Sequence, residues 1–119
     1  MGERAIVLFK DEDSYAPGVY LHWHGDDVPA WLKEAGPSLR AGDAGYAAAR
    51  FAQFCGNRIE GSLSLGLTAA PTEEEREDWE DYSPGDHGVF VVDCESGKVE
   101  QHGEAYGEVK PFTITLGKF

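Results

Sequence analysis

The sequence predicts an α+β fold in which a mainly antiparallel sheet of about five to six strands carries two helices on one face. Six segments show the alternating or continuous apolar pattern of β-strands. Two other segments, adjacent in the chain, carry apolar residues at helical spacing. Strands that cluster instead of alternating with helices favour this class over a parallel βαβ sheet. A chain of 119 residues has the length of one domain, so we expect a single globular domain over residues 1–119.

The first two strands are expected at residues 4–10 and 19–24. The earlier segment is rich in Ile, Val, Leu and Phe and ends at a polar cluster. In the later segment, period-two alternation predicts a core face made of Val19, Leu21 and Trp23.

The two helices are expected at residues 28–35 and 43–55. Asp26 or Asp27 can cap the first helix, which tolerates a proline in its first turn. Its apolar stripe consists of Val28, Trp31, Leu32 and Ala35. Asp43 can cap the second helix, and the pair Gly56–Asn57 is expected to end it through a left-handed backbone conformation.

The second half of the chain predicts four more strands, at residues 63–67, 88–93, 99–102 and 112–116. The segment 88–93 is almost continuously apolar, as is typical of a central strand. A short polar turn at residues 95–98 predicts that it forms a β-hairpin with the segment that follows.

The charge excludes some classes of partner. The chain has 22 Asp and Glu against 10 Lys and Arg, for a formal net charge of −12. Such a surface repels the phosphates of nucleic acid and of anionic membranes, so we expect neither of them to be a direct ligand. The expected partner is a basic protein surface. The N-terminal apolar run covers only residues 5–9, too short for a signal peptide. The two cysteines are isolated in the sequence, which indicates buried thiols instead of a disulfide. The short N-terminal apolar run and the free thiols together predict a cytoplasmic protein.

More than half of the net charge lies in one place, an acidic insert at about residues 71–86. Its residues 73–86, called the acidic segment below, hold eight carboxylates and one arginine, for a local charge of −7. One interpretation is a solvated segment whose two aromatic residues pin it to the body. The other is a docking surface for a partner rich in Lys and Arg. The candidate partner-binding residues are Glu73, Glu74, Glu75, Glu77, Asp78, Trp79, Glu80, Asp81 and Tyr82.

An alternative site lies at Tyr20, His22 and His24. Two histidines separated by one residue on a strand project from the same face, a workable spacing for two ligands of one metal ion or for acid–base chemistry. Histidines paired with Tyr20 or with carboxylates are the plainer interpretation, because no second ligand pair has a recognisable spacing. Signatures of common hydrolases, nucleotide-binding loops and zinc proteases are missing. We therefore expect a protein that is not an enzyme and has no cofactor.

Four strings in the chain, VYLHWHG at 19–25, YAAARF at 46–51, SLGL at 64–67 and GVFVVD at 88–93, resemble small uncharacterised proteins carried by bacteriophages and mobile elements. The resemblance implies a setting in which small acidic proteins often inhibit host defence, as anti-CRISPR proteins do. The predicted function is thus a non-enzymatic acidic binding domain that occupies a basic site on a host nucleic-acid-handling protein, acting as a monomer or homodimer. The alternatives are a small metal-dependent or acid–base enzyme and an accessory protein.

Overall fold

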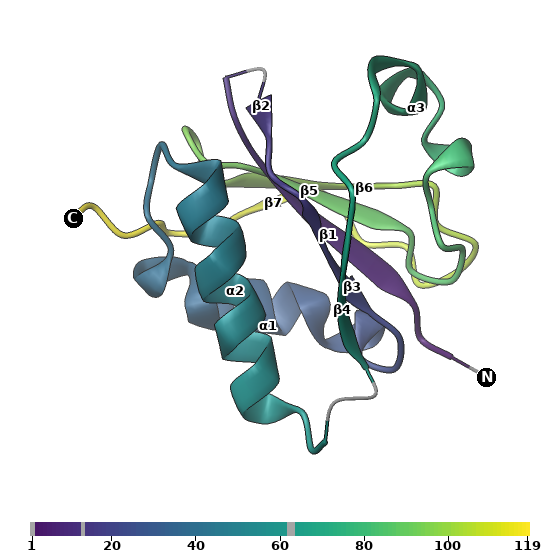
Figure 1. Ribbon diagram of the computed structural model, residues 1–119, viewed down its shortest axis with the longest axis horizontal. Coiled ribbons are helices and arrows are strands. Elements are labelled where there is room, and N and C mark those ends of the chain that lie inside the picture. The colour runs from purple at the N-terminus through teal and green to yellow at the C-terminus, as the bar shows by residue number, and fades with distance from the viewer. Residues whose placement is uncertain (1, 13, 62–63) are drawn as a thin grey trace.

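The sheet is mixed, and its central pair is parallel. The computed structural model describes residues 2–12, 14–61 and 64–119. Its seven strands are β1 (Ala5–Asp11), β2 (Ser14–Tyr15), β3 (Gly18–Leu21), β4 (Leu65–Thr68), β5 (Val89–Asp93), β6 (Lys98–His102) and β7 (Phe112–Thr113). They are ordered β4-β3-β1-β5-β6-β7, with β2 paired to β1 (Figure 1). β1 and β5 run parallel and every other pair is antiparallel. The α+β class is therefore confirmed, with more strands than expected.

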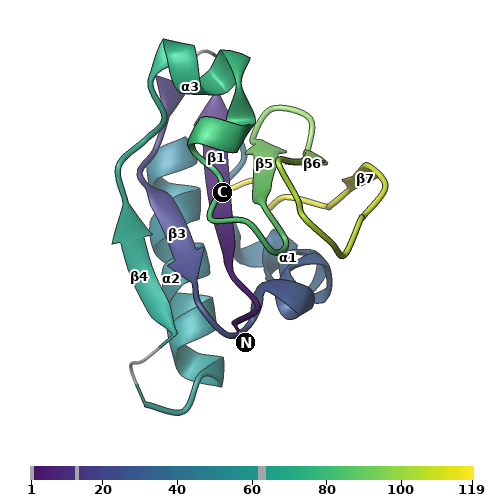
Figure 2. The same cartoon turned by 90° about the vertical axis from the view of Figure 1, so that its right-hand side faces the viewer.

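In the described part of the chain, three α-helices accompany the sheet: α1 (Val28–Ala35), α2 (Ala44–Arg58) and α3 (Glu73–Glu77). The first two pack on one face, where side chains from β1 such as Val7 and Phe9 meet Leu32 of α1 and Phe51 of α2. These four side chains are fully buried. The larger core therefore lies between the sheet and these two helices, as the sequence predicted (Figure 2).

A second, smaller apolar cluster lies on the opposite face. It consists of Ile6 and Leu8 of β1 with Val89 and Val91 of β5. These positions alternate with the helix-facing residues along the same two strands, so both faces of the central pair are apolar. This explains why residues 88–93 form a nearly continuous apolar run, and it requires some other part of the chain to cover the second face.

Local signals located the helix starts well and one helix end poorly. α1 has the predicted bounds, although Asp27 at its N-cap position makes no side-chain capping bond. The Asp43 carboxylate caps α2 as predicted, accepting a hydrogen bond from the Tyr46 amide at 3.0 Å. The expectation that α2 ends at Gly56–Asn57 is wrong, because the helix continues to Arg58 and the left-handed glycine comes later, at Gly61.

Two strand predictions also need correction. β3 ends at Leu21, and Trp23 is 47% exposed instead of lying in the core. The chain leaves the sheet there, with the Trp23 amide donating to the Ser64 hydroxyl. At the C-terminus only Phe112–Thr113 of the expected strand pairs, with β6. Of the predicted strand at 63–67, residue Leu63 lies outside the described residues.

The β5–β6 hairpin has the predicted turn, and its geometry requires glycine. Gly97 has φ +79°, and a Cβ atom there would approach the Ile114 carbonyl oxygen to 2.2 Å. The C-terminal segment therefore packs against the turn at a distance that no other residue permits.

Candidate functional site

The acidic segment covers the second apolar face of the sheet. It forms α3 and a 3-10 turn at Trp79–Asp81, which lie across from α1 and α2 in Figure 2. Thr72 and Glu75 form a reciprocal capping box, with the Glu75 amide bonded to the Thr72 hydroxyl at 3.1 Å and the Thr72 amide to the Glu75 carboxylate at 2.8 Å. This capping box holds the start of the short helix in place.

The two aromatic residues of the segment face the sheet. Trp79 and Tyr82 both pack against the smaller apolar cluster. The Trp79 ring stacks on His102, with centroids 5.2 Å apart and planes 16° from parallel. The Tyr82 hydroxyl donates to the Ala69 carbonyl at 2.5 Å, and burial raises its pKa to about 12. These rings therefore anchor the segment to the body of the protein, the first of the two interpretations drawn from the sequence.

Most of the carboxylates of the segment face solvent. Six of them are exposed, namely those of Glu73, Glu74, Glu77, Asp78, Glu80 and Asp81. Among the described residues, none of the six lies within 4.0 Å of a Lys, Arg or His nitrogen. Their charges are therefore free to act on a partner.

The one cation of the segment points away from this surface. The Arg76 guanidinium donates to the Pro71 carbonyl at 3.1 Å and lies over the Tyr15 ring at 5.0 Å from its centroid. It lines a hollow of about 250 Å³ on the sheet face, together with Lys10, Lys98 and other residues. Asp93 and Glu100 also line the hollow, and Glu100 pairs with Lys98 at 3.8 Å, so three cations against two carboxylates leave a formal charge of +1.

The histidine pair does not form one site. The His22 imidazole Nδ1 is bonded to the Tyr20 hydroxyl at 2.7 Å, whereas the His24 Nδ1 is bonded to the Ser64 hydroxyl at 2.8 Å and its ring stacks on Trp31. The two rings thus have different partners, and the strand alternation that would align them ends at Leu21. In the ranges described, no group of three His, Cys, Asp or Glu residues is arranged to hold a metal ion.

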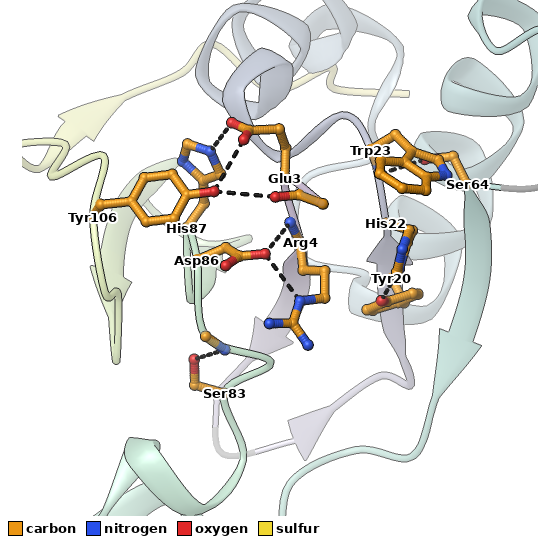
Figure 3. Close-up of polar contacts among 12 residues, drawn as sticks. Glu3, Arg4, Tyr20, His22, Trp23, Ser64, Ser83, Asp86, His87 and Tyr106 are labelled. Carbon is orange, nitrogen blue, oxygen red and sulfur yellow. Dashed lines mark hydrogen bonds and ion pairs between the residues drawn. The ribbon is translucent and has the colours of Figure 1, made fainter.

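A polar cluster that the sequence did not indicate ties the N-terminus to two distant loops (Figure 3). The Glu3 carboxylate bonds to the His87 Nε2 at 2.7 Å and accepts from the Tyr106 hydroxyl at 2.9 Å. These two bonds, the His87 bond first, lower the pKa of Glu3. Desolvation, followed by the bond to Glu3, raises the pKa of Tyr106 to about 12. Because Glu3 and His87 are 84 residues apart, no spacing in the sequence could have revealed the cluster.

An ion pair extends this cluster. Arg4 bonds through its Nε to Asp86 at 2.9 Å and through its amide at 3.0 Å, and the side-chain bond is the main reason why the pKa of Asp86 is lowered. His87 is 6% exposed, and its ring packs edge-on against Tyr106. The buried His87 imidazole, bonded through its Nε2 to Glu3, therefore ties the start of β1 to the loop that precedes β5.

Both cysteines are buried and free. Burial raises the pKa of Cys55 and of Cys94 to about 12. That is the opposite of what a thiolate nucleophile requires.

Comparison with protein-family models, with curated proteins and with solved structures found no match. Every helix in the described ranges falls short of the length and apolar character that a bilayer span requires.

Proposed function

We propose that this protein is a non-enzymatic binding domain whose acidic segment occupies a basic site on a protein partner. The observation that carries the proposal is the set of six exposed carboxylates with no cation within 4.0 Å in the described chain. A surface kept for solubility alone needs charge but no fixed geometry. Here the capping box and the rings of Trp79 and Tyr82 hold the carboxylates on a folded scaffold, so little ordering entropy opposes binding.

The partner class follows from the chemistry of the segment. Carboxylates on a fixed scaffold suit a site lined by Lys and Arg, and sites that normally receive nucleic-acid phosphates have this composition. The proposed partner is therefore a nucleic-acid-handling protein of a bacterial host, and binding would exclude its nucleic acid. The bacteriophage resemblance and the anti-CRISPR-like inhibitor role belong to the same proposal.

The test compares capture of partners by the wild-type protein and by a charge variant. The charge variant carries Glu73→Gln, Glu74→Gln, Glu77→Gln and Glu80→Gln. These changes remove four charges from exposed side chains, none of which forms an ion pair within the described residues. If each exposed pair contributes about 0.2–1 kcal/mol, the loss is roughly 1–4 kcal/mol, or about 5- to 800-fold in Kd. Wild-type binding should also weaken steeply with salt, since screening acts over about 10 Å at 0.1 M.

A matched control removes four exposed charges elsewhere, with Asp26→Asn, Glu60→Gln, Glu95→Gln and Glu108→Gln. This variant has the same net charge as the first but should keep the partner. The captured protein is then tested for nucleic-acid binding with and without the acidic protein. Equal capture by the two variants, or a partner whose nucleic-acid binding is unchanged, would show that the proposal is wrong.

A further inference from the structure

The two edges of the sheet differ in how they are protected. Natural proteins blunt exposed edge strands with charges or prolines, because unpaired backbone groups recruit other strands. β7, at one edge, follows directly on Lys110 and Pro111. β4, at the other edge, reads Leu-Gly-Leu-Thr and has neither. In the part of the chain that the structure describes, nothing pairs with the outer side of β4.

An apolar hollow lies beside this open edge. Leu67 is opposite the buried Val19 of β3, so its side chain is on the helix-bearing face of the sheet, yet it is 72% exposed. α2 leaves a gap there of about 210 Å³, lined by Pro17, Gly45, Ala48, Ala49, Ala52 and Leu67. The hollow has room for one apolar side chain, and no carboxylate lines it.

We infer that β4 binds an extended segment of the protein partner as an added strand. In this mode main-chain hydrogen bonds to the edge supply affinity, and a neighbouring pocket for alternate side chains supplies specificity. An apolar side chain of the partner would enter the hollow between β4 and α2. This inference rests on the proposed function, because it identifies how the basic partner is gripped.

The charge along the groove indicates the rest of the partner segment. No charged side chain lines the hollow, so the hollow itself does not attract cations. The chain leaves β4 at Thr68 and climbs directly to α3 (Figure 2). There Glu73, Glu74 and Glu77 line a shallow depression.

Glu73, the first carboxylate of α3, is six residues beyond Leu67 in the chain. At roughly 3.3 Å per extended residue, a partner segment alongside β4 would cover that separation in at most about six residues. The partner segment should therefore carry an apolar anchor and, about five residues away, Lys or Arg. Either order is compatible, because an added strand can run in either direction along β4.

The probe is a library of random twelve-residue peptides, selected on the full-length protein. Enriched peptides should share one apolar residue about five positions from Lys or Arg, in either order. Ala49→Glu fills the hollow with a charged side chain and should reduce their affinity at least tenfold. Ala30→Glu places the same change on an exposed position of α1, so it is the matched control and should leave affinity unchanged.

A second measurement distinguishes strand addition from simple contact. N-methylation along a bound peptide should abolish binding at every second residue and be tolerated between, because an edge strand bonds with alternate residues of its neighbour. Failure to enrich any peptide, equal binding to Ala49→Glu and Ala30→Glu, or no alternation in the N-methyl series would overturn the inference.

Failure of this inference can be told apart from failure of the proposed function. A triple variant tests this, with Glu73→Gln, Glu74→Gln and Glu77→Gln. It should bind peptides that carry Lys or Arg more weakly than the wild type does, and should bind peptides that retain only the apolar anchor as tightly as the wild type does. If the triple variant binds every peptide as tightly as the wild type does while Ala49→Glu binds them more weakly, the peptide site at β4 is supported and the acidic docking surface is contradicted. If the triple variant fails to capture the host partner while Ala49→Glu captures it normally, the acidic docking surface is supported and strand addition at β4 is contradicted.

Discussion

Replacing Trp79 with alanine should destabilise the fold, because its ring covers the apolar face of β1 and β5 opposite the two helices. The change removes roughly 150 Å² of buried apolar surface. At about 25 cal/mol per Å², reduced because unfolded chains already bury part of this area, the loss is about 2–3 kcal/mol. The lost stacking on His102 at 5.2 Å adds about 0.5–1 kcal/mol. We expect a total of roughly 3 kcal/mol.

Urea unfolding followed by far-UV circular dichroism measures this directly. With an m-value of about 2 kcal/mol/M, the midpoint of Trp79→Ala should fall by about 1.5 M. Trp23→Ala is the matched control, since it removes the same ring from a site that is 47% exposed, and it should cost less than about 1 kcal/mol. Equal losses of unfolding free energy in the two variants would show that Trp79 does not anchor the acidic segment. Its ring would then again be a candidate partner contact.

Three further outcomes follow from the site and the core. Because the His87 bond lowers the pKa of Glu3 below its ordinary value, the stability that this bond supplies is fully present above that ordinary value and is lost as the pH falls through the lower folded value. Glu3→Gln should therefore be less stable than wild type at pH 7 in urea titrations, and the difference should shrink as the pH is lowered through the acid range. Cys55 and Cys94, with pKa values of about 12, should resist a thiol reagent at pH 8 in the native protein and react fully in urea. Gly97→Ala should destabilise by more than about 2 kcal/mol in the same urea assay, since its Cβ would meet a carbonyl oxygen at 2.2 Å; a near-neutral result would contradict the packing of the C-terminal segment on the β5–β6 turn.

The parts of the fold that could be predicted are those with local causes. The Asp43 cap, the Thr72–Glu75 capping box and the β5–β6 turn each depend on residues within a few positions of one another. The parallel pairing of β1 with β5 depends on contacts between segments about 80 residues apart, which no local pattern encodes. The continuous apolar run at 88–93 indicated a central strand but not which strands flank it.

The candidate site shows the same division. The location of the acidic charge was evident from the sequence, whereas the direction of each side chain was not. The sequence favours Trp79 and Tyr82 as partner-binding residues, because aromatic residues often anchor interfaces. The need to cover Ile6, Leu8, Val89 and Val91 explains their orientation instead, and that need follows only from the order of the strands.

The acidic segment and the apolar hollow beside Leu67 should affect different rate constants of partner binding. With the rings turned inward, the acidic segment offers a partner charge but little apolar contact, and exposed charges mainly raise the association rate in a salt-dependent way. The apolar hollow beside Leu67 offers apolar contact but no charge, and a desolvated anchor in it would mainly slow dissociation. Removing the carboxylates of Glu73, Glu74, Glu77 and Glu80 should therefore lower the association rate constant and flatten its salt dependence. Ala49→Glu should instead raise the dissociation rate constant. Stopped-flow or surface-binding kinetics in which both variants change the same rate constant would show that the two surfaces do not act as separate elements of one interface.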